Sequence, residues 1–181
     1  MRHRIALGSI VAVAALLAAP PGRAASSSSN VDLQISGGSL TISAPASASL
    51  PAVSAAPGSV SSVSLGTTTL ADTRGTLLGW TVTVMASGNW SDGAGHSISL
   101  GAGASTLMWS TGGLTAQGAA SLTGVSAGVG GTVTTSAPTA VATALLGFGA
   151  GTYTWNGTLT FTVPANVFAS TYTVTLVQTA A

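Results

Sequence analysis

Few residues of this chain could do acid–base or nucleophilic chemistry. Beyond the N-terminal leader described below, the chain has one histidine, His96, three aspartates, no glutamate and no cysteine. A Ser-His-Asp triad would have to use His96, and Asp92 lies too near to it in sequence to be an obvious orienting carboxylate. His96 shares the parity of Ile98 and Leu100, which favours a hydrogen-bonded histidine at the rim of a sheet over a catalytic base.

The three aspartates form no recognisable catalytic or metal-binding pattern. A paired-carboxylate glycosidase would need two of Asp32, Asp72 and Asp92, which are widely spaced in sequence. One histidine with dispersed carboxylates has no metal-ligand spacing, and "SDGAG" at 91–95 lacks the repeated acids of a calcium loop, so we predict a turn there. The sequence therefore predicts no catalytic residue, no metal and no cofactor, and we do not expect an enzyme.

Arg74 is the only basic residue after the leader, and it lies two positions from Asp72 in "LADTRGTLLGWTV". On an extended segment, residues at i and i+2 point to the same face, so these two side chains can pair. Gly75 and Gly79 permit a loop before Trp80. We predict a structural ion pair that fixes the entry and register of the strand beginning at Trp80, in preference to direct contact with a ligand.

Residues 1–24 have the features of a secretory signal peptide. Arg2 and Arg4 precede an apolar run, and the segment ends in small residues at Ala24. The apolar run is shorter than the roughly 20 residues of a membrane-spanning helix, and no second run follows it. We predict a signal peptide at 1–24, a flexible lead-in with a first short strand at 25–38, and one domain at 39–181 of a secreted protein that does not span a membrane.

Charge excludes two classes of partner. Without the leader, Arg74 stands against three aspartates, so the net charge is +1 − 3 = −2. A chain with no basic patch has nothing to neutralise phosphates, which argues against binding to nucleic acid or to anionic lipid. About 155 residues can bury a core without disulfides, and a secreted domain without cysteine is more typical of a prokaryotic surface protein than of an animal extracellular module.

Alternation of apolar residues with threonine predicts strands through most of the chain. The pattern is strict from 153 to 163 and recurs at 80–84, 98–100 and 171–176. Only 136–149 hints at a helical turn or two. Many short strands joined by Gly-, Ser- and Pro-rich turns predict an all-β fold, an antiparallel β-sandwich of the Ig-like or Greek-key type.

The four tryptophans differ in their expected environments. Trp80 and Trp155 fall on the apolar parity of strong strands, and Trp109 shares the parity of Leu107, so we expect all three to be buried. Trp90 lies among turn residues in "SGNWSDG". It is either an exposed ring that stacks on a sugar or anchors an interface, or a ring folded back over the end of the sandwich.

Three segments of the chain belong together in a further comparison: "LTISAPASASL", then "VSLGTTTLADTRGTLLGWTVTV", and finally "LTFTVPANVFASTYTVTL". They resemble the WxL domain, a non-covalent cell-wall-attachment domain of Gram-positive surface proteins. The resemblance covers roughly Ser39 to the end, and Trp80-Thr81-Val82 stands for the family's first Trp-x-Leu element. Gln178 and Ala180 occupy the positions of the second element. The sequence and this resemblance together give Trp80, Val82, Trp90 and Tyr172 as candidate binding residues.

Three functional classes follow from these observations. The leading expectation is a secreted cell-surface protein, localised outside the cell, that associates non-covalently with cell-wall peptidoglycan or with a wall-bound partner protein. The alternative is a structural or assembly subunit that self-associates or complements a partner by β-strand addition, because its strands carry few charges to discourage edge pairing. An enzyme acting on wall glycan would rest on His96 and the aspartates alone.

Overall fold

The computed structural model describes residues 30–101 and 106–181, so the predicted signal peptide at 1–24 lies outside the described residues. The chain divides into two units, Met1–Gln34 and Ile35–Ala181, and the strands listed below all lie in the second. The first short strand was expected within 25–38. In the described part of that range there is none, and the first strand is β1 (Leu40–Ser43).

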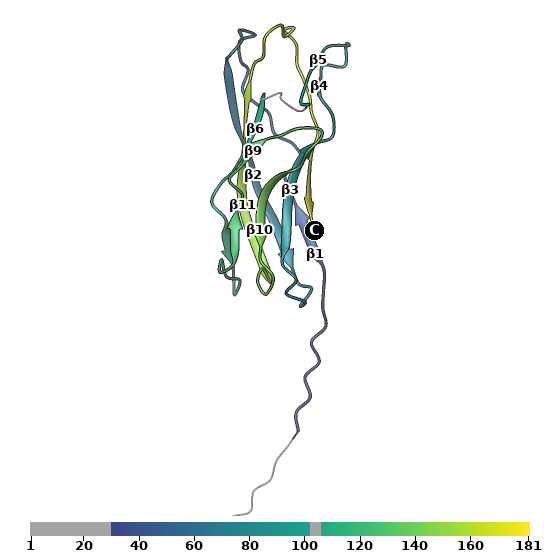
Figure 1. Cartoon of the computed structure of the whole chain (residues 1–181), viewed down its shortest axis with the longest axis vertical. Coiled ribbons are helices and arrows are strands. Elements are labelled where there is room, and N and C mark those ends of the chain that lie inside the picture. Colours follow the sequence, from purple (N-terminus) through teal and green to yellow (C-terminus); the bar gives the residue numbers. More distant parts are fainter. Residues whose placement is uncertain (1–29, 102–105) are drawn as a thin grey trace, which may run out of the picture. The chain divides into compact units, whose positions relative to one another are not determined.

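Two antiparallel sheets form the main body of the second unit (Figure 1). The larger sheet has the order β1, β2 (Val60–Asp72), β11 (Gly151–Thr162), β6 (Leu107–Thr111) and β9 (Gly131–Thr132), and β7 (Thr115–Gln117) pairs with β11. The smaller sheet has the order β12 (Leu176–Ala180), β3 (Trp80–Ala86), β10 (Thr139–Ala144) and β8 (Val125–Ala127). A hairpin of β4 (Trp90–Ser91) and β5 (Ser97–Ile98) is separate from both. The predicted all-β antiparallel sandwich is confirmed.

The core lies between the inner faces of the two sheets. Trp109, Trp155 and Tyr153 are the largest fully buried side chains, and Val82 and Val84 face them from the smaller sheet with no exposed surface. Along β11 the buried residues fall on the odd positions, as the period of two predicted. Burial of this large apolar area is the main force that holds the sheets together.

A β-bulge in β2 decides which side chains face inward near its end. Thr158 of β11 pairs with Ser64 but Asn156 pairs with Thr67, so β2 holds one extra residue between them. Gly66 lies there with a φ of 85°, a conformation that glycine adopts without strain. Beyond the bulge the even positions are buried, and Asp72, the last residue of β2, is therefore directed into the end of the sandwich.

Two segments differ from their predictions. The segment 136–149 does not form helical turns, because its residues 139–144 are the strand β10, which pairs with both β3 and β8. These tertiary hydrogen bonds override a weak local preference for helix. The strand expected at 171–176 begins only at Leu176, because the chain before it turns toward the β4–β5 hairpin and makes an isolated bridge from Thr173 to Ser91. In the part of the chain that the structure describes, no helix is long and apolar enough to cross a membrane.

Candidate functional site: an ion-paired corner and two leucine loops

The predicted ion pair between Asp72 and Arg74 is present, with two-point geometry. Arg74 Nε donates to Asp72 Oδ1 at 3.0 Å and Nη2 donates to Oδ2 at 2.9 Å, while the Arg74 backbone N–H reaches Oδ1 at 3.1 Å. The Asp72 side chain is 4% exposed and the Arg74 side chain 23% exposed. This is the fork-to-carboxylate arrangement that gives the most directional of the common ion pairs.

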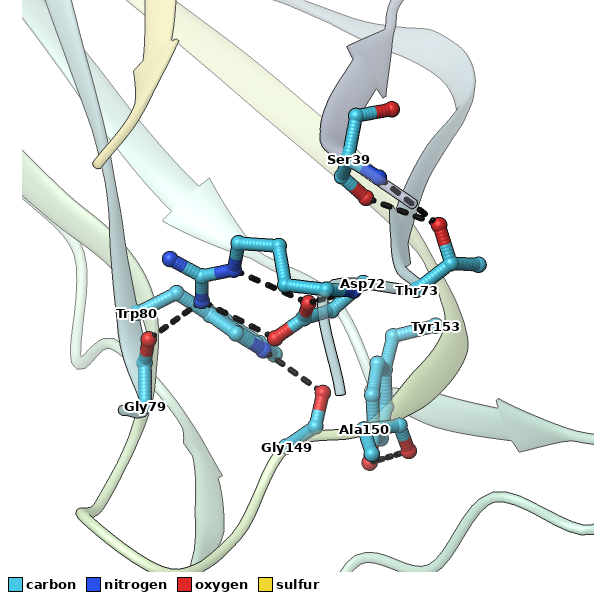
Figure 2. Close-up of polar contacts among 9 residues, drawn as sticks. Ser39, Asp72, Thr73, Gly79, Trp80, Gly149, Ala150 and Tyr153 are labelled. Atoms are coloured by element: carbon cyan, nitrogen blue, oxygen red, sulfur yellow. Dashed lines mark hydrogen bonds and ion pairs between the residues drawn. The ribbon is translucent and has the colours of Figure 1, made fainter. Parts of the chain in front are cut away.

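The same guanidinium closes the loop that leads into β3. Arg74 Nη2 also donates to the carbonyl oxygen of Gly79 at 2.6 Å, directly before Trp80 (Figure 2). The loop 73–79 is therefore fastened at both ends by one guanidinium, which binds the Asp72 carboxylate before the loop and the Gly79 carbonyl at its end. The predicted role of Arg74 in fixing the entry of the Trp80 strand agrees with this geometry.

Two aromatic residues fasten the neighbouring loops to this corner. The Trp80 indole N–H donates to the carbonyl oxygen of Gly149 at 2.9 Å, and the Trp80 ring packs on Tyr153 with centroids 5.4 Å apart (Figure 2). The Tyr153 hydroxyl lies within hydrogen-bond distance of the carbonyl oxygens of Ser121 and Ala150, at 3.0 and 3.1 Å. Buried side chains thus hold three loops in fixed positions at this end of the sandwich.

The charges at the corner stabilise each other. Hydrogen bonds from the Arg74 side chain lower the pKa of the Asp72 carboxyl, against the opposing effect of burial, and the Asp72 carboxylate raises the pKa of Arg74. Burial raises the pKa of the Tyr153 hydroxyl. Both members of the pair are therefore ionised at neutral pH while Tyr153 stays neutral.

Beside this corner, five large apolar side chains face solvent on two loops, which we call the leucine loops. Their exposed fractions range from 39% to 75%, and the residues are Leu77, Leu78, Leu145, Leu146 and Phe148. The loops lie side by side because Gly147 N–H donates to the Leu77 carbonyl at 2.8 Å. They are at the opposite end of the sandwich from β4 and β5 (Figure 1). Neighbouring exposed apolar side chains are typical of an interaction surface.

Leu77 is held in an unusual backbone conformation. Its φ is 52°, in the left-handed region that a bulky residue with a Cβ rarely adopts. Residues kept in this region are held there by the surrounding contacts, and they cluster at functional sites. Here the surrounding contacts are the Arg74 bond to Gly79 and the Gly147 bond to Leu77. The strained backbone at Leu77 is thus held in place by these contacts, and the Leu77 side chain faces solvent.

A repeated sequence signal marks the leucine loops. Residues 77–80 read Leu-Leu-Gly-Trp and residues 145–148 read Leu-Leu-Gly-Phe. Two adjacent leucines break the period of two, so one of them cannot face the core of a regular strand. The doublets lie outside the alternating segments that mark the strands, and their contact with each other depends on the topology.

The structure does not bring the four candidate binding residues to one surface, although Trp90 and Tyr172 line the same cavity. Trp80 is 3% exposed and Val82 is fully buried, because the alternation in β3 directs both into the core, so neither is available to a wall polymer. Trp90 is 9% exposed and packs edge-on against Phe161 at 5.5 Å, which is the folded-back alternative. Tyr172 is partly buried and donates its hydroxyl to the Phe168 carbonyl at 2.9 Å.

Asp92 and His96 do interact, contrary to the sequence argument. His96 Nδ1 lies 2.6 Å from Asp92 Oδ2, and the backbone N–H groups of Ala94 and His96 donate to Oδ1 at 2.8 and 3.0 Å. The predicted turn at 91–95 brings the two residues together, so their proximity in sequence favours contact. His96 also stacks on Phe168 with centroids 4.1 Å apart, and it is a hydrogen-bonded residue at the start of β5, as predicted.

We expect the Asp92 carboxyl to titrate far below an ordinary aspartate. Partial burial would raise its pKa, but hydrogen bonds from Ala94 N–H and from His96 outweigh that effect and lower the pKa to about 2. The carboxylate therefore contributes its full stabilisation of the turn at any pH above 3.8, the ordinary pKa of an aspartate. This contribution is lost as the pH falls through the lowered pKa of about 2. An NMR titration should show the Ala94 amide signal shifting near pH 2 in the native chain and not shifting in Asp92→Asn. A midpoint near 3.8 would contradict this arrangement.

Comparisons with protein-family models, with curated proteins and with solved structures find no match to this chain. The resemblance to the WxL domain therefore stays a prediction from the sequence.

Proposed function

We propose that this chain is an exported binding module of the cell surface that associates non-covalently with the cell wall through a wall-bound partner protein. The observation that carries the proposal is the pair of leucine loops, where five large apolar side chains are held toward solvent. The leader at 1–24 and the resemblance to a wall-attachment domain support the cellular setting.

The leucine loops have the physical properties of a binding surface rather than of a loosely packed end. Arg74, Trp80 and Tyr153 fix the loop backbones through buried or partly buried hydrogen bonds, so a partner would meet a preorganised surface. Burying each exposed leucine against a partner is favourable by about 1.5 kcal/mol or more. A few such side chains at the centre of a contact supply most of the binding energy in typical interfaces.

The chemistry of the leucine loops favours a protein over a glycan as the partner. Sugar rings are recognised by flat aromatic faces together with polar groups. All four tryptophans are 9% exposed or less, and four of the five exposed side chains in the loops are aliphatic. Arg74, the charge nearest in sequence to these loops, is already paired with Asp72. An apolar patch on a partner protein is the complementary surface.

Co-sedimentation with two wall preparations tests the proposal. Protein secreted by its expression host is mixed with Gram-positive walls that retain their surface proteins, and with peptidoglycan stripped of protein. We expect retention on the first and none above a charge-matched β-sandwich control on the second. Because the surface is apolar, retention should change little between low and high salt. Retention on stripped peptidoglycan would identify a glycan ligand instead, and no retention on either would overturn wall association.

A second candidate function has its own observation. The edge strands β1 and β12 carry no charged residue, and β12 leaves one edge without a strand partner among the described residues. Uncharged edges of this kind can add a strand from another copy. In a concentration series of sedimentation velocity, self-association should then raise the mass above that of one chain. A mass that stays constant at that of one chain would exclude self-association. One chain has a mass of 17.3 kDa with its leader and a smaller mass without it.

A further inference from the structure

A cavity of about 800 Å³ lies in the sandwich, and no residue of the leucine loops lines it. One wall is the inner face of the larger sheet, including Val63 on β2 and Phe161 on β11. The facing wall is the segment 170–176 with Gln178 of β12, and Trp90 of the hairpin also contributes. Its volume falls within the range of about 300–1,000 Å³ found for small-molecule sites.

The lining carries no charge, and its wall from the larger sheet is apolar, whereas the segment 170–178 adds hydroxyl and amide groups. Leucine, isoleucine, valine and phenylalanine side chains make up much of the wall from the larger sheet, and neither an aspartate, an arginine nor a histidine lines the cavity. A charged ligand would lose its hydration there without meeting a counter-ion, at a cost of several kcal/mol. The lining therefore selects an uncharged ligand with an aliphatic body.

Two of the residues that line the cavity each carry a buried polar atom without a hydrogen-bond partner among the described residues. The two atoms are Nε1 of Trp90 and Oε1 of Gln178. Trp90 as a whole is only 9% exposed. A buried polar group without a partner destabilises a fold by about 1–3 kcal/mol, so such groups in a native structure need an explanation. An indole N–H can only donate and an amide oxygen can only accept, so the missing partner must offer an acceptor to one and a donor to the other.

The segment 44–53 covers part of the cavity and forms no strand. Pro45 and Pro51 lie within it and cannot donate backbone hydrogen bonds. The Ser61 hydroxyl donates to the Pro51 carbonyl at 2.7 Å, which fastens the segment to β2 at that point. A wall of this kind can move aside at lower cost than a paired strand, because few backbone bonds are broken.

We propose that this cavity binds an uncharged amphiphile, a molecule with an aliphatic chain and a hydroxyl or amide group. The chain occupies the space against Val63 and Phe161. When the Trp90 and Gln178 side chains turn toward the cavity, the polar group accepts a hydrogen bond from Trp90 Nε1 and donates one to Gln178 Oε1. The site is independent of the leucine loops, so its test does not depend on wall association.

A fluorescent displacement assay tests this site. The neutral fluorophore N-phenyl-1-naphthylamine is the probe, and dodecan-1-ol and dodecanoate at pH 8 are the competitors, all below their aggregation limits. We expect the native protein to enhance the probe's fluorescence and dodecan-1-ol to displace it. Dodecanoate should need a concentration at least about tenfold higher, because its charge has no partner in the cavity. A folded native protein that does not bind the probe would overturn the proposal.

Variants on β12 provide a matched pair. Gln178→Trp fills the cavity from an inward position, whereas Thr179→Trp adds the same ring on the exposed face of the same strand. The first should weaken probe binding at least about tenfold and the second should leave it unchanged. Equal binding by both variants would place the probe elsewhere.

Two milder variants cover the case in which Gln178→Trp does not fold. Trp90→Phe keeps an aromatic ring without the N–H donor, and Gln178→Leu keeps the bulk without the acceptor. Each should weaken displacement by dodecan-1-ol about three- to tenfold, the value of one hydrogen bond. Unchanged displacement in both would contradict the polar part of the proposal.

Discussion

Replacing Arg74 with alanine is expected to lower the midpoint of thermal unfolding by roughly 5 to 10 °C at neutral pH. The variant leaves the Asp72 carboxylate, which is 4% exposed, without its cation, and it also frees the loop that Arg74 fastens at Gly79. An uncompensated buried carboxylate is more costly than the absence of the whole pair. Differential scanning calorimetry measures the effect directly.

The double variant Asp72→Asn with Arg74→Ala is the control for this mechanism. It removes the unpaired charge, so its midpoint should lie above that of Arg74→Ala alone. A double variant that is as unstable as the sum of the two single variants would show that the two side chains are not coupled. Normal stability of Arg74→Ala with lost wall retention would instead assign Arg74 to ligand contact.

The effect of Arg74→Ala should also shrink in acid. In the native chain the pKa of Asp72 is lowered, so the pair stabilises the fold above the ordinary aspartate pKa of about 4 and loses this contribution as the pH falls through the lowered value. In the variant, burial acts without the guanidinium and the charged carboxylate destabilises the fold until it is protonated. The two midpoints should therefore converge as the pH is lowered.

Replacing Leu78 and Leu146 with serine is expected to reduce retention on protein-bearing walls by at least about tenfold. These side chains are 64% and 75% exposed, and one comes from each leucine loop. Because neither packs in the core, the free energy of unfolding should change by no more than about 0.5 kcal/mol. The measurement is co-sedimentation over a range of protein concentrations, beside circular dichroism for the fold.

Val129→Ser is the matched control for the leucine loops. Val129 is fully exposed and belongs to neither loop, so its replacement removes apolar surface without touching the proposed site. Its retention should equal that of the native protein. If both variants lose retention to the same degree, the association depends on general apolar surface and the leucine loops are not a specific site.

The sequence predicted much of the fold because the alternation of apolar residues with threonine is strict in the long strands. Burial alternates along β3 and along β11 from Tyr153 onward, and the inward residues include Trp155 and Trp80. The β-bulge at Gly66 was not predicted. The inward residues change there from odd to even positions, but they include the polar residues Ser61 and Thr68, so the apolar pattern does not reveal the change. The inward position of Asp72 depends on that bulge.

In the candidate site, too, contacts between residues close in sequence were predictable, whereas contacts between distant segments were not. The pair of Asp72 and Arg74 was predictable because its members are two residues apart. The leucine loops were not, since Leu77 and Gly147 meet only after β3 and β10 pair. The burial of Trp90 and the cavity beside it also depend on long-range packing, which no local pattern in one sequence specifies.

The strand order of the two sheets has a consequence for how fast this chain folds. β2 pairs with β11 and β3 pairs with β12, so each sheet closes only when segments from opposite halves of the second unit meet. Chains of such high contact order refold in milliseconds to seconds, far more slowly than helical proteins of similar size.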